Sequence, residues 1–246
     1  MSEARSPARL QILLPVYNEA ATIEATLREL ATTLAGVDGV ELVVCEDGST
    51  DGTREIITRL AAVLAMRLVL GAGRKGYARA VVDGFRTCTA PYVATMDADG
   101  QCDPRDFARF LPLLGRADVL MGYRVTRRDT LRRRAMSGLF RVLYRRVLGV
   151  TLRDPSCPFI VFSRESLGHL LAVPTLGMMR QGFWWEVVAR LSRAGFTFHE
   201  VPVHHRPRAA GRTQVYRTGR LAGIFFGHLR ACVRIRREPI PPRRPG

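Results

Sequence analysis

The chain has 246 residues, of which 47% are hydrophobic and 24% are charged. This length can bury the core of one α/β domain, and this charged fraction argues against wholesale disorder. The formal net charge is +16, but residues 1–123 carry 13 basic and 16 acidic side chains, whereas residues 124–246 carry 25 and 6. The basic second half therefore predicts an anionic partner: phosphate groups, a membrane surface or nucleic acid.

Export and membrane insertion are both disfavoured by the sequence. The five cysteines are an odd number without the spacing of metal ligands or of a redox pair, which fits a reducing compartment. No apolar stretch of signal-peptide length opens the chain, and no run of about 18 apolar residues occurs in it. We therefore expect a cytoplasmic location, peripheral on the cytoplasmic face of the membrane.

Short apolar runs alternate with helix-like stretches through the first half of the chain. The runs cover residues 10–16, 42–45, 67–70, 92–96 and 119–121, and the helical stretches cover about 19–35, 52–65, 76–88 and 104–115. Asn18 is expected to cap the first helix, and Thr50 or Asp51 the second. The alternation predicts an α/β fold with a mostly parallel sheet flanked by helices, and ligands in such sheets sit beyond the carboxyl ends of the strands.

Two basic amphipathic helices are expected in the second half, over residues 131–149 and 216–237. Their apolar side chains recur at helical spacing, with arginines on another face. Such helices are typical of membrane surfaces, or of core helices with one solvated face. We favour the core for 131–149 and leave both interpretations open for 216–237. The expected organisation is a globular domain over 1–215, an amphipathic helix over 216–237 and a disordered Pro/Arg tail over 238–246.

Two carboxylates follow the apolar run at 92–96. Asp97 and Asp99 cannot both be buried there without a cation. Carboxylate oxygens suit Mg²⁺ or Mn²⁺, and Gln101 would add an oxygen on the same side if the stretch stays extended. On its own, this pattern also fits a solvated acidic turn.

Polar or glycine-rich turns also follow the first three runs, at residues 15–19, 46–53 and 71–76. The carboxylate of Glu46 is placed to accept a hydrogen bond from the imino N–H of a nucleotide base, whereas residues 49–51 fit a helix-capping turn. The glycine-rich loop at 71–76 contains Lys75 and is of a kind that can approach phosphates.

The order of four segments resembles the family 2 glycosyltransferases with the GT-A fold. LLPVYNE, VVCEDGSTDGT, GRKGYARA and ATMDADGQCDP follow one another in this order, and the resemblance extends over about residues 9–215. It implies a single GT-A-type, Rossmann-like domain that uses a nucleotide sugar and Mg²⁺ or Mn²⁺. It places Pro15, Tyr17, Glu19, Glu46, Lys75 and Asp97 at the nucleotide, and Asp97, Asp99 and Gln101 at the metal and the diphosphate. The family usually has Asp where this chain has Glu46.

The second half resembles the polyprenyl-phosphate branch of this family, the dolichol-phosphate mannose synthase type. The matching pieces are residues 122–124, 153–159, 200–203 and 205–214, with Pro158 where Gly is common and Gln214 where Lys is common. The resemblance implies inverting transfer of a hexose from a GDP- or UDP-sugar to a polyprenyl phosphate. Its implied catalytic residues are Asp99, Arg124, Arg133 and Arg208. Arginines suit the gathering of two phosphate groups, and an ionised phosphate acceptor needs no general base.

Two other functions stay open. Glu186 lies where family members with a hydroxyl acceptor carry a catalytic base, although we favour a structural role for it. A non-enzymatic basic module that binds anionic lipid or nucleic acid would leave the clustered acids unexplained, and no nucleic-acid recognition motif is visible. The expected partners are therefore a nucleotide-sugar donor, a polyprenyl-phosphate acceptor, an anionic membrane surface and a membrane-anchor protein, without nucleic acid.

Overall fold

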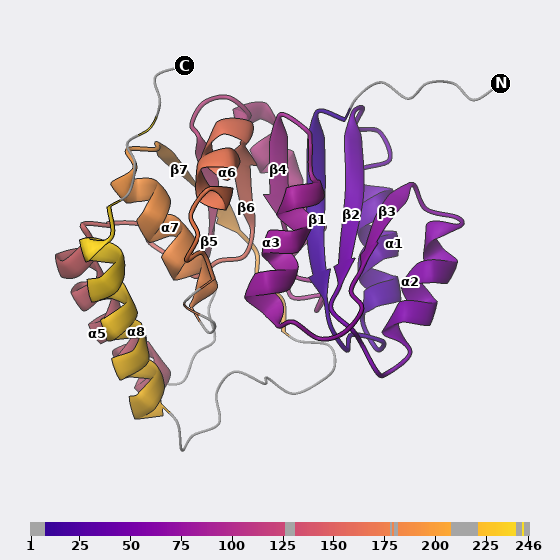
Figure 1. The fold of residues 1–246 in the computed structure, drawn as a ribbon. Helices are drawn as coiled ribbons and strands as arrows, with labels where there is room; N and C mark the ends of the chain where they lie inside the picture. The colour runs from indigo at the N-terminus through magenta and orange to yellow at the C-terminus, as the bar shows by residue number, and fades with distance from the viewer. Residues whose placement is uncertain are drawn as a thin grey trace.

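The computed structural model describes residues 8–125, 131–177, 179, 182–207, 221–239 and 243, with only the backbone described for 131–137, 139 and 221–225. Seven strands form one sheet in the order β3-β2-β1-β4-β6-β5-β7 (Figure 1). They are β1 Leu10–Val16, β2 Val40–Glu46, β3 Met66–Leu70, β4 Tyr92–Thr95, β5 Val119–Arg124, β6 Ile160–Ser163 and β7 Phe198–Val203. Only β6 among these runs antiparallel to its neighbours, β4 and β5. The carboxyl ends of the other strands therefore meet at one edge, as the sequence predicted.

Helices cover both faces of this sheet. They are α1 Ile23–Thr33, α2 Thr53–Ala61, α3 Tyr77–Thr87, α4 Phe107–Phe110, α5 Leu131–Leu148, α6 Arg164–Leu171, α7 Phe183–Arg193 and α8 Leu221–Arg237; 3-10 turns at Pro104–Asp106 and Leu111–Leu113 flank α4. The helices α3 and α6 lie over one face, and α1 and α2 pack together on the other (Figure 1). The predicted α/β architecture is confirmed.

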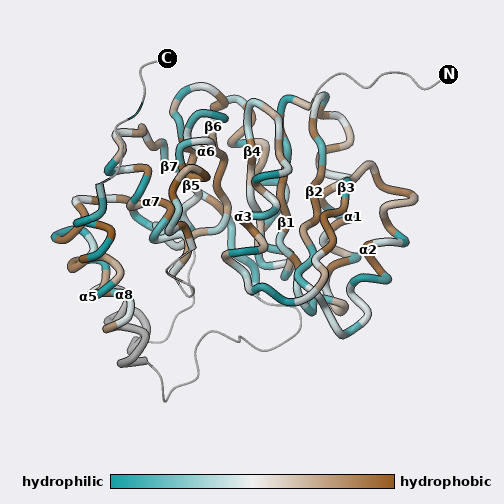
Figure 2. The backbone as a smooth tube through the Cα atoms, viewed as in Figure 1, coloured by the Kyte–Doolittle hydropathy of each residue, from teal (hydrophilic) through white to brown (hydrophobic). Residues whose placement is uncertain are grey.

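The core sits between the sheet and its helices. All seven residues of β1 are buried, and Figure 2 shows the central strands in the brown of hydrophobic residues. The side chain of Leu13 faces α3, where Gly84 allows close approach: a Cβ on Gly84 would lie 2.6 Å from Leu13 Cδ1. Burying a leucine side chain of this kind contributes about 2 kcal/mol, so this packing holds the first strand and α3 together.

The predicted caps of the first two helices are wrong. Thr22 stands at the N-cap of α1 and Gly52 at that of α2. Asn18 instead has φ +52° and accepts a hydrogen bond through Oδ1 from the Thr50 N–H at 2.8 Å. Asp51 lies one residue before the cap, yet its carboxylate accepts from the first N–H of α2 at 3.1 Å. The polar residues therefore join the turn after β1 to the turn after β2, because both turns lie at the same sheet edge.

The two basic helices of the second half, α5 and α8, lie side by side next to α7 (Figure 1). On α8, Cys232 and Ile235 are buried, whereas the predicted apolar residues Leu229 and Val233 are only partly buried. The side of α8 that packs against the protein therefore carries Cys232 and Ile235, and it is rotated from the apolar side that was expected to include Leu229 and Val233. No helix in the described part of the chain is both long and apolar enough to cross a membrane.

Part of the predicted tail is described. Glu238 bonds to Arg190 on α7 at 2.6 Å, and Arg243 pairs with Asp118 and Glu165 at 2.9 and 2.8 Å. The other predicted tail residues, apart from Pro239, lie outside the described ranges.

Candidate active site

Acidic side chains gather where β4 ends. The carboxylate of Asp99 is buried and that of Asp97 is partly buried. Burial, reinforced by the negative charge of Asp99, raises the pKa of Asp97 to about 7. Two carboxylates held this close repel one another, so the arrangement calls for a cation between or beside them.

The described residues supply only part of a metal site. No group of three or more His, Cys, Asp or Glu side chains among the described residues is arranged to hold a metal ion. Mg²⁺ and Mn²⁺ commonly bind through one or two carboxylates and complete their shell with substrate phosphates and water. The donor set of Asp97 and Asp99 fits a cation of this kind, shared with a bound diphosphate.

Gln101 does not lie as its prediction assumed. The chain turns at Gly100, which has φ +73°, so the stretch from Asp97 to Gln101 is not extended. The amide nitrogen of Gln101 points to the carbonyl oxygen of Arg206 at 3.4 Å. The expectation that an extended stretch places Gln101 on the same side as Asp97 and Asp99 is therefore wrong, and a metal role for Gln101 stays a prediction.

Glu46 is not an open carboxylate. It is 1% exposed, and its oxygens accept hydrogen bonds from the Ser49 N–H and from the Arg54 guanidinium, whose Nε lies 2.9 Å away. Burial alone would raise the pKa of Glu46, but these hydrogen bonds lower it below its ordinary value. The expected contact with a nucleotide base therefore meets a carboxylate that is already paired, because Glu46 faces α2 instead of the open edge.

The neighbouring acid, Asp47, faces the glycine-rich loop instead. Its two oxygens accept hydrogen bonds from the backbone N–H groups of Lys75 and Gly76 at 2.7 and 2.8 Å. Gly48 lets the two loops touch, since a Cβ there would lie 2.6 Å from Arg74 N. The ammonium group of Lys75 turns away to Asp83 at 2.7 Å, so only its backbone joins the contact with Asp47.

The turn after β1 adds an aromatic and an acidic side chain. The guanidinium of Arg74 lies 4.0 Å from the centre of the Tyr17 ring. Glu19 accepts a hydrogen bond from the Thr22 hydroxyl at 2.9 Å, and Pro15 is buried within β1. The loop of residues 71–76 and Tyr17 thus lie together at this edge, and their predicted contact with a nucleotide stays a prediction.

Arg124 ends β5 at the same edge and is held by a carboxylate. Its Nε and Nη2 donate to the two oxygens of Asp154 at 2.6 and 2.8 Å, and Nη2 also donates to the Ser156 hydroxyl at 2.7 Å. Burial opposes the charge of Arg124, but the pairing with Asp154 raises its pKa above the ordinary value. Its positive charge also opposes the rise in the pKa of Asp97, which places the two groups within electrostatic reach.

The segment after β7 is fastened to the acidic turn. The Arg206 N–H donates to the Gln101 carbonyl at 2.8 Å, and the Arg206 side chain pairs with Asp103 at 2.8 Å. His204 Nδ1 lies 2.9 Å from Asp106. Arg208 and the side chain of Arg133 lie outside the described residues, so their predicted roles stay predictions.

Glu186 is enclosed in the protein. It is 0% exposed, accepts from the Met179 N–H at 2.7 Å, and bonds to Arg190 Nε at 2.9 Å. Burial raises the pKa of Glu186, and the hydrogen bonds from Met179 and Arg190 oppose that rise. This geometry supports the structural role that we favoured, since the described residues enclose the carboxylate completely.

The sequence interpretation missed several site residues. Asp47 follows Glu46, and Asp154 follows Arg153. Both lie inside segments that carry the family resemblance, but neither was given a role. Tyr77 and Trp184 were missed because 107 positions separate them in the chain, yet Trp184 Nε1 donates to the Tyr77 hydroxyl at 3.0 Å. Strand alternation alone would have separated Glu46 from Asp47, since successive side chains point to opposite faces.

Solved structures share this architecture. A mannosyltransferase from Pyrobaculum calidifontis, in complex with GDP-Man and Mn²⁺, matches with a TM-score of 0.63 at 21% identity, over 94% of this chain and 73% of that one. Glucosyl-3-phosphoglycerate synthase from Mycobacterium tuberculosis, in complex with Mn²⁺, UDP and glucosyl-3-phosphoglycerate, matches with 0.65 at 20% identity, over 93% and 80%. The likeness shows the GT-A fold that the resemblance implied.

Curated relatives are similar over most of this chain. Glycosyltransferase AglD of Haloferax volcanii is 31% identical over 85% of this chain and 35% of that protein. An undecaprenyl-phosphate 4-deoxy-4-formamido-L-arabinose transferase of Pseudomonas fluorescens is 27% identical over 89% and 63%. The chain thus spans between about a third and two thirds of their length. The family model described as glycosyl transferase family 2 matches residues 11–171, and the chain belongs to that family.

Proposed function

We propose that this protein transfers a hexose from a GDP- or UDP-sugar to a polyprenyl phosphate, with inversion at the sugar carbon. The observation that carries the proposal is that one sheet edge holds the carboxylates of Asp97 and Asp99 together with the fixed guanidinium of Arg124, whose charge acts on Asp97. Family membership supports the reaction class, and relatives named for undecaprenyl phosphate support the acceptor class.

Each side chain of the edge has a defined task in this proposal. Asp47 orders the glycine-rich loop by accepting from the N–H groups of Lys75 and Gly76, and this loop and Tyr17 form the nucleotide wall. A Mg²⁺ or Mn²⁺ ion held by Asp97 and Asp99 would stabilise charge on the departing nucleoside diphosphate. The hydrogen bonds to Asp154 fix the orientation of the Arg124 side chain. Arg124 then presents its positive charge where two phosphate groups must meet.

The acceptor phosphate needs no base from the protein. A phosphate monoester is largely ionised near neutral pH, so it requires only positioning and charge compensation. Arg133 and Arg208 are proposed to supply that compensation with Arg124. The burial of Glu186 supports this assignment over a hydroxyl acceptor, since a general base must reach the proton that it removes.

The direct test is product formation. Full-length protein, a polyprenyl phosphate, Mn²⁺ and a panel of labelled GDP- and UDP-sugars are expected to yield a lipid-linked sugar. Asp99→Asn should reduce the rate of transfer by about a thousandfold, because the metal ion would lose a charged ligand and would stabilise the departing diphosphate less well. Asp38→Asn changes an exposed carboxylate in the turn before β2, at the other end of that strand from the site, and should have no effect on the rate. Absence of lipid-linked sugar with every donor would refute the proposed reaction.

The surface formed by α5 and α8 supports a peripheral position on an anionic membrane. Arg141, Arg145, Arg146, Arg230 and Arg237 are exposed on it, and within the described part of the chain none of them pairs with an acid. Phe226 and Val142 are also exposed there, at 58% and 49%. Exposed apolar side chains together with exposed arginines suit the headgroup region of anionic lipid. The five cysteines are all free and buried, which fits the cytoplasmic face.

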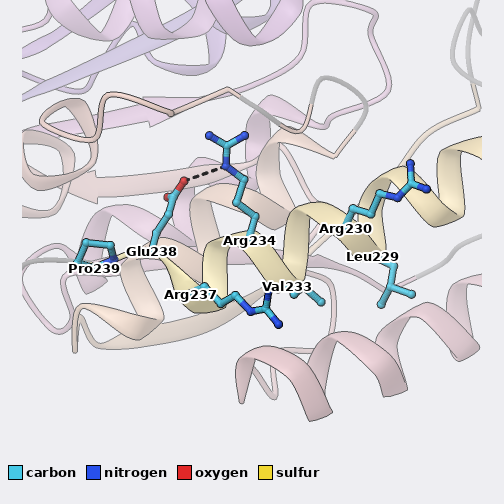
Figure 3. A pocket seen from close by; sticks show the side chains of 7 residues that line it. All are labelled: Leu229, Arg230, Val233, Arg234, Arg237, Glu238 and Pro239. Carbon is cyan, nitrogen blue, oxygen red and sulfur yellow. Dashed lines mark ion pairs between the residues drawn. The ribbon is translucent and has the colours of Figure 1, made fainter.

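A shallow groove of about 570 Å³ runs along this surface of α8. Figure 3 shows Leu229 and Val233 on a different side of the helix from Arg230 and Arg234, with Arg234 directed to Glu238 at 3.5 Å. The groove thus joins an apolar strip to a basic strip. It is proposed to lie against the lipid surface, with Phe226 nearest the acyl chains.

Binding to vesicles tests this position. The double variant Arg230→Gln, Arg237→Gln should bind vesicles rich in phosphatidylserine about 30-fold more weakly, since each basic side chain near such a surface contributes about 1 kcal/mol. The control variant Arg59→Gln, Arg116→Gln removes the same charge from the other half. Co-sedimentation at 0.15 M salt gives the affinities. Equal losses in both variants would indicate general charge attraction and contradict a defined α8 surface.

A further inference from the structure

Tyr77 connects two helices to the carboxylate cluster. It is the first residue of α3, and its hydroxyl donates to Oδ1 of Asp97 at 2.8 Å. The hydroxyl oxygen of Tyr77 in turn accepts a hydrogen bond from Trp184 Nε1 at 3.0 Å. The two rings meet edge to face, with centroids 6.2 Å apart at 82°. Trp184 belongs to α7, so α3, α7 and the end of β4 join at one hydroxyl group.

The polarity of this chain of hydrogen bonds is fixed by chemistry. An indole N–H can only donate, and an ionised carboxylate can only accept. The Tyr77 hydroxyl has a single proton, which Asp97 takes, and it offers a lone pair to Trp184. No alternative orientation of the hydroxyl satisfies both partners. Trp184, itself only 7% exposed, therefore determines the direction in which Tyr77 donates.

The hydrogen bond also selects one orientation of the Asp97 carboxylate. The final torsion of an aspartate side chain is broad and roughly two-fold, so rotation about it has little intrinsic preference. Tyr77 engages Oδ1, which leaves Oδ2 directed away from the hydroxyl. A carboxylate held in this way meets a cation without first having to be ordered.

We propose that Tyr77 is a positioning residue that presents Oδ2 of Asp97 to the metal ion, and that Trp184 anchors Tyr77 in that role. The proposal rests on the metal-dependent function proposed above and adds the device that pre-orders its ligand. It also makes Trp184 an optical reporter, because the indole lies two hydrogen bonds from the cation. The sequence contains only one other tryptophan, Trp185.

The first test is metal affinity, measured apart from turnover. Titration calorimetry with Mn²⁺ in the presence of saturating UDP or GDP should give a roughly tenfold to hundredfold weaker affinity for Tyr77→Phe, the range typical when a side chain that orients a metal ligand is removed. Trp184→Phe should have a smaller effect, since Tyr77 can still donate to Asp97. Tyr92→Phe deletes the same atom at the opposite end of β4 and should bind Mn²⁺ as the unaltered protein does.

The second test uses fluorescence. In a Trp185→Phe background excited at wavelengths beyond nucleotide absorption, Mg²⁺ should change the emission of Trp184, and adding Tyr77→Phe should remove that change. If Tyr77→Phe binds Mn²⁺ as tightly as Tyr92→Phe, the positioning role is wrong while the proposed function stands. If the unaltered protein itself binds no Mn²⁺ with either nucleotide, both proposals fail.

Discussion

Asp97→Asn will raise the melting temperature of the metal-free protein at pH 8 and abolish the extra stability that Mn²⁺ and a nucleoside diphosphate confer. Burial beside Asp99 raises the pKa of Asp97 to about 7, from an ordinary value of 3.8. At pH 8 Asp97 is largely ionised in the folded protein, and its repulsion by the charge of Asp99 costs stability that an asparagine avoids. Asparagine keeps an oxygen that can accept from Tyr77, so the packing around position 97 is preserved.

The sign of the pH dependence follows from the direction of that shift. Between about pH 4 and pH 7 the folded protein holds a proton on Asp97 that the unfolded chain has released. Stability from this group therefore falls as pH rises through that window and stays low above it. Asp97→Asn should lack this decline. Mn²⁺ competes with the same proton, so its affinity for the unaltered protein should weaken about tenfold for each pH unit below 7.

Thermal unfolding from pH 5 to pH 8, with and without Mn²⁺ and UDP or GDP, measures both effects. Asp38→Asn, at an exposed carboxylate, controls for the loss of one negative charge. A ligand that binds only the folded state raises its stability in proportion to the logarithm of concentration over Kd, so the loss of that rise reports lost binding. A lower melting temperature for metal-free Asp97→Asn at pH 8 would show that the two carboxylates are not in conflict.

Much of the fold followed from local pattern. The strands β1 to β5 were predicted to within a few residues because short apolar runs rich in β-forming side chains mark them, and their order placed the polar turns at one edge. The strands β6 and β7 were not among the predicted runs. The helix starts were wrong because capping depends on where the chain turns: Asn18 adopts a left-handed conformation and serves the β2 turn. Contacts of that kind join segments that the sequence leaves 32 positions apart.

The site was predicted less well at the level of individual side chains. Leu42, Val44 and Glu46 share one face of β2 by alternation, and on that face Arg54 of α2 pairs with the carboxylate of Glu46. The next residue, Asp47, therefore faces the glycine-rich loop. Motif matching counts residues without asking which face they occupy, so it did not anticipate that Glu46 is paired with Arg54 or that Asp47 binds the backbone of the glycine-rich loop.

The C-terminal helix shows the same limit on a larger scale. Its hydrophobic pattern supports two apolar stripes, and the sequence does not say which one meets α5 and α7. Burial of Cys232 and Ile235 decides this, leaving Leu229 and Val233 beside the groove. The choice depends on the shape of the neighbouring helices, which only the assembled fold provides.

Arg190→Met will lower the free energy of unfolding by about 3 to 5 kcal/mol, because it leaves the buried carboxylate of Glu186 without its cation. Arg190 and Glu186 are both 0% exposed, and Arg190 also binds Glu238 at 2.6 Å and the Thr175 hydroxyl at 2.9 Å. Glu186→Gln should cost less, since Arg190 keeps its contacts with Glu238 and Thr175. Urea unfolding at pH 7 measures both losses.

The double variant Glu186→Gln, Arg190→Met distinguishes a buried ion pair from two separate contributions. Removing both charges together should restore part of the stability that Arg190→Met loses, because no charge is then left unpaired within the pair. Glu186→Gln alone should retain sugar transfer to a polyprenyl phosphate within a few-fold, as a structural carboxylate requires. A fall of several orders of magnitude at unchanged stability would instead identify Glu186 as a base, and the acceptor would then be a hydroxyl group. The stability and the transfer rate of Glu186→Gln therefore separate the two acceptor chemistries. A buried partner of Arg190 predicts a retained rate, whereas a catalytic base predicts a lost one.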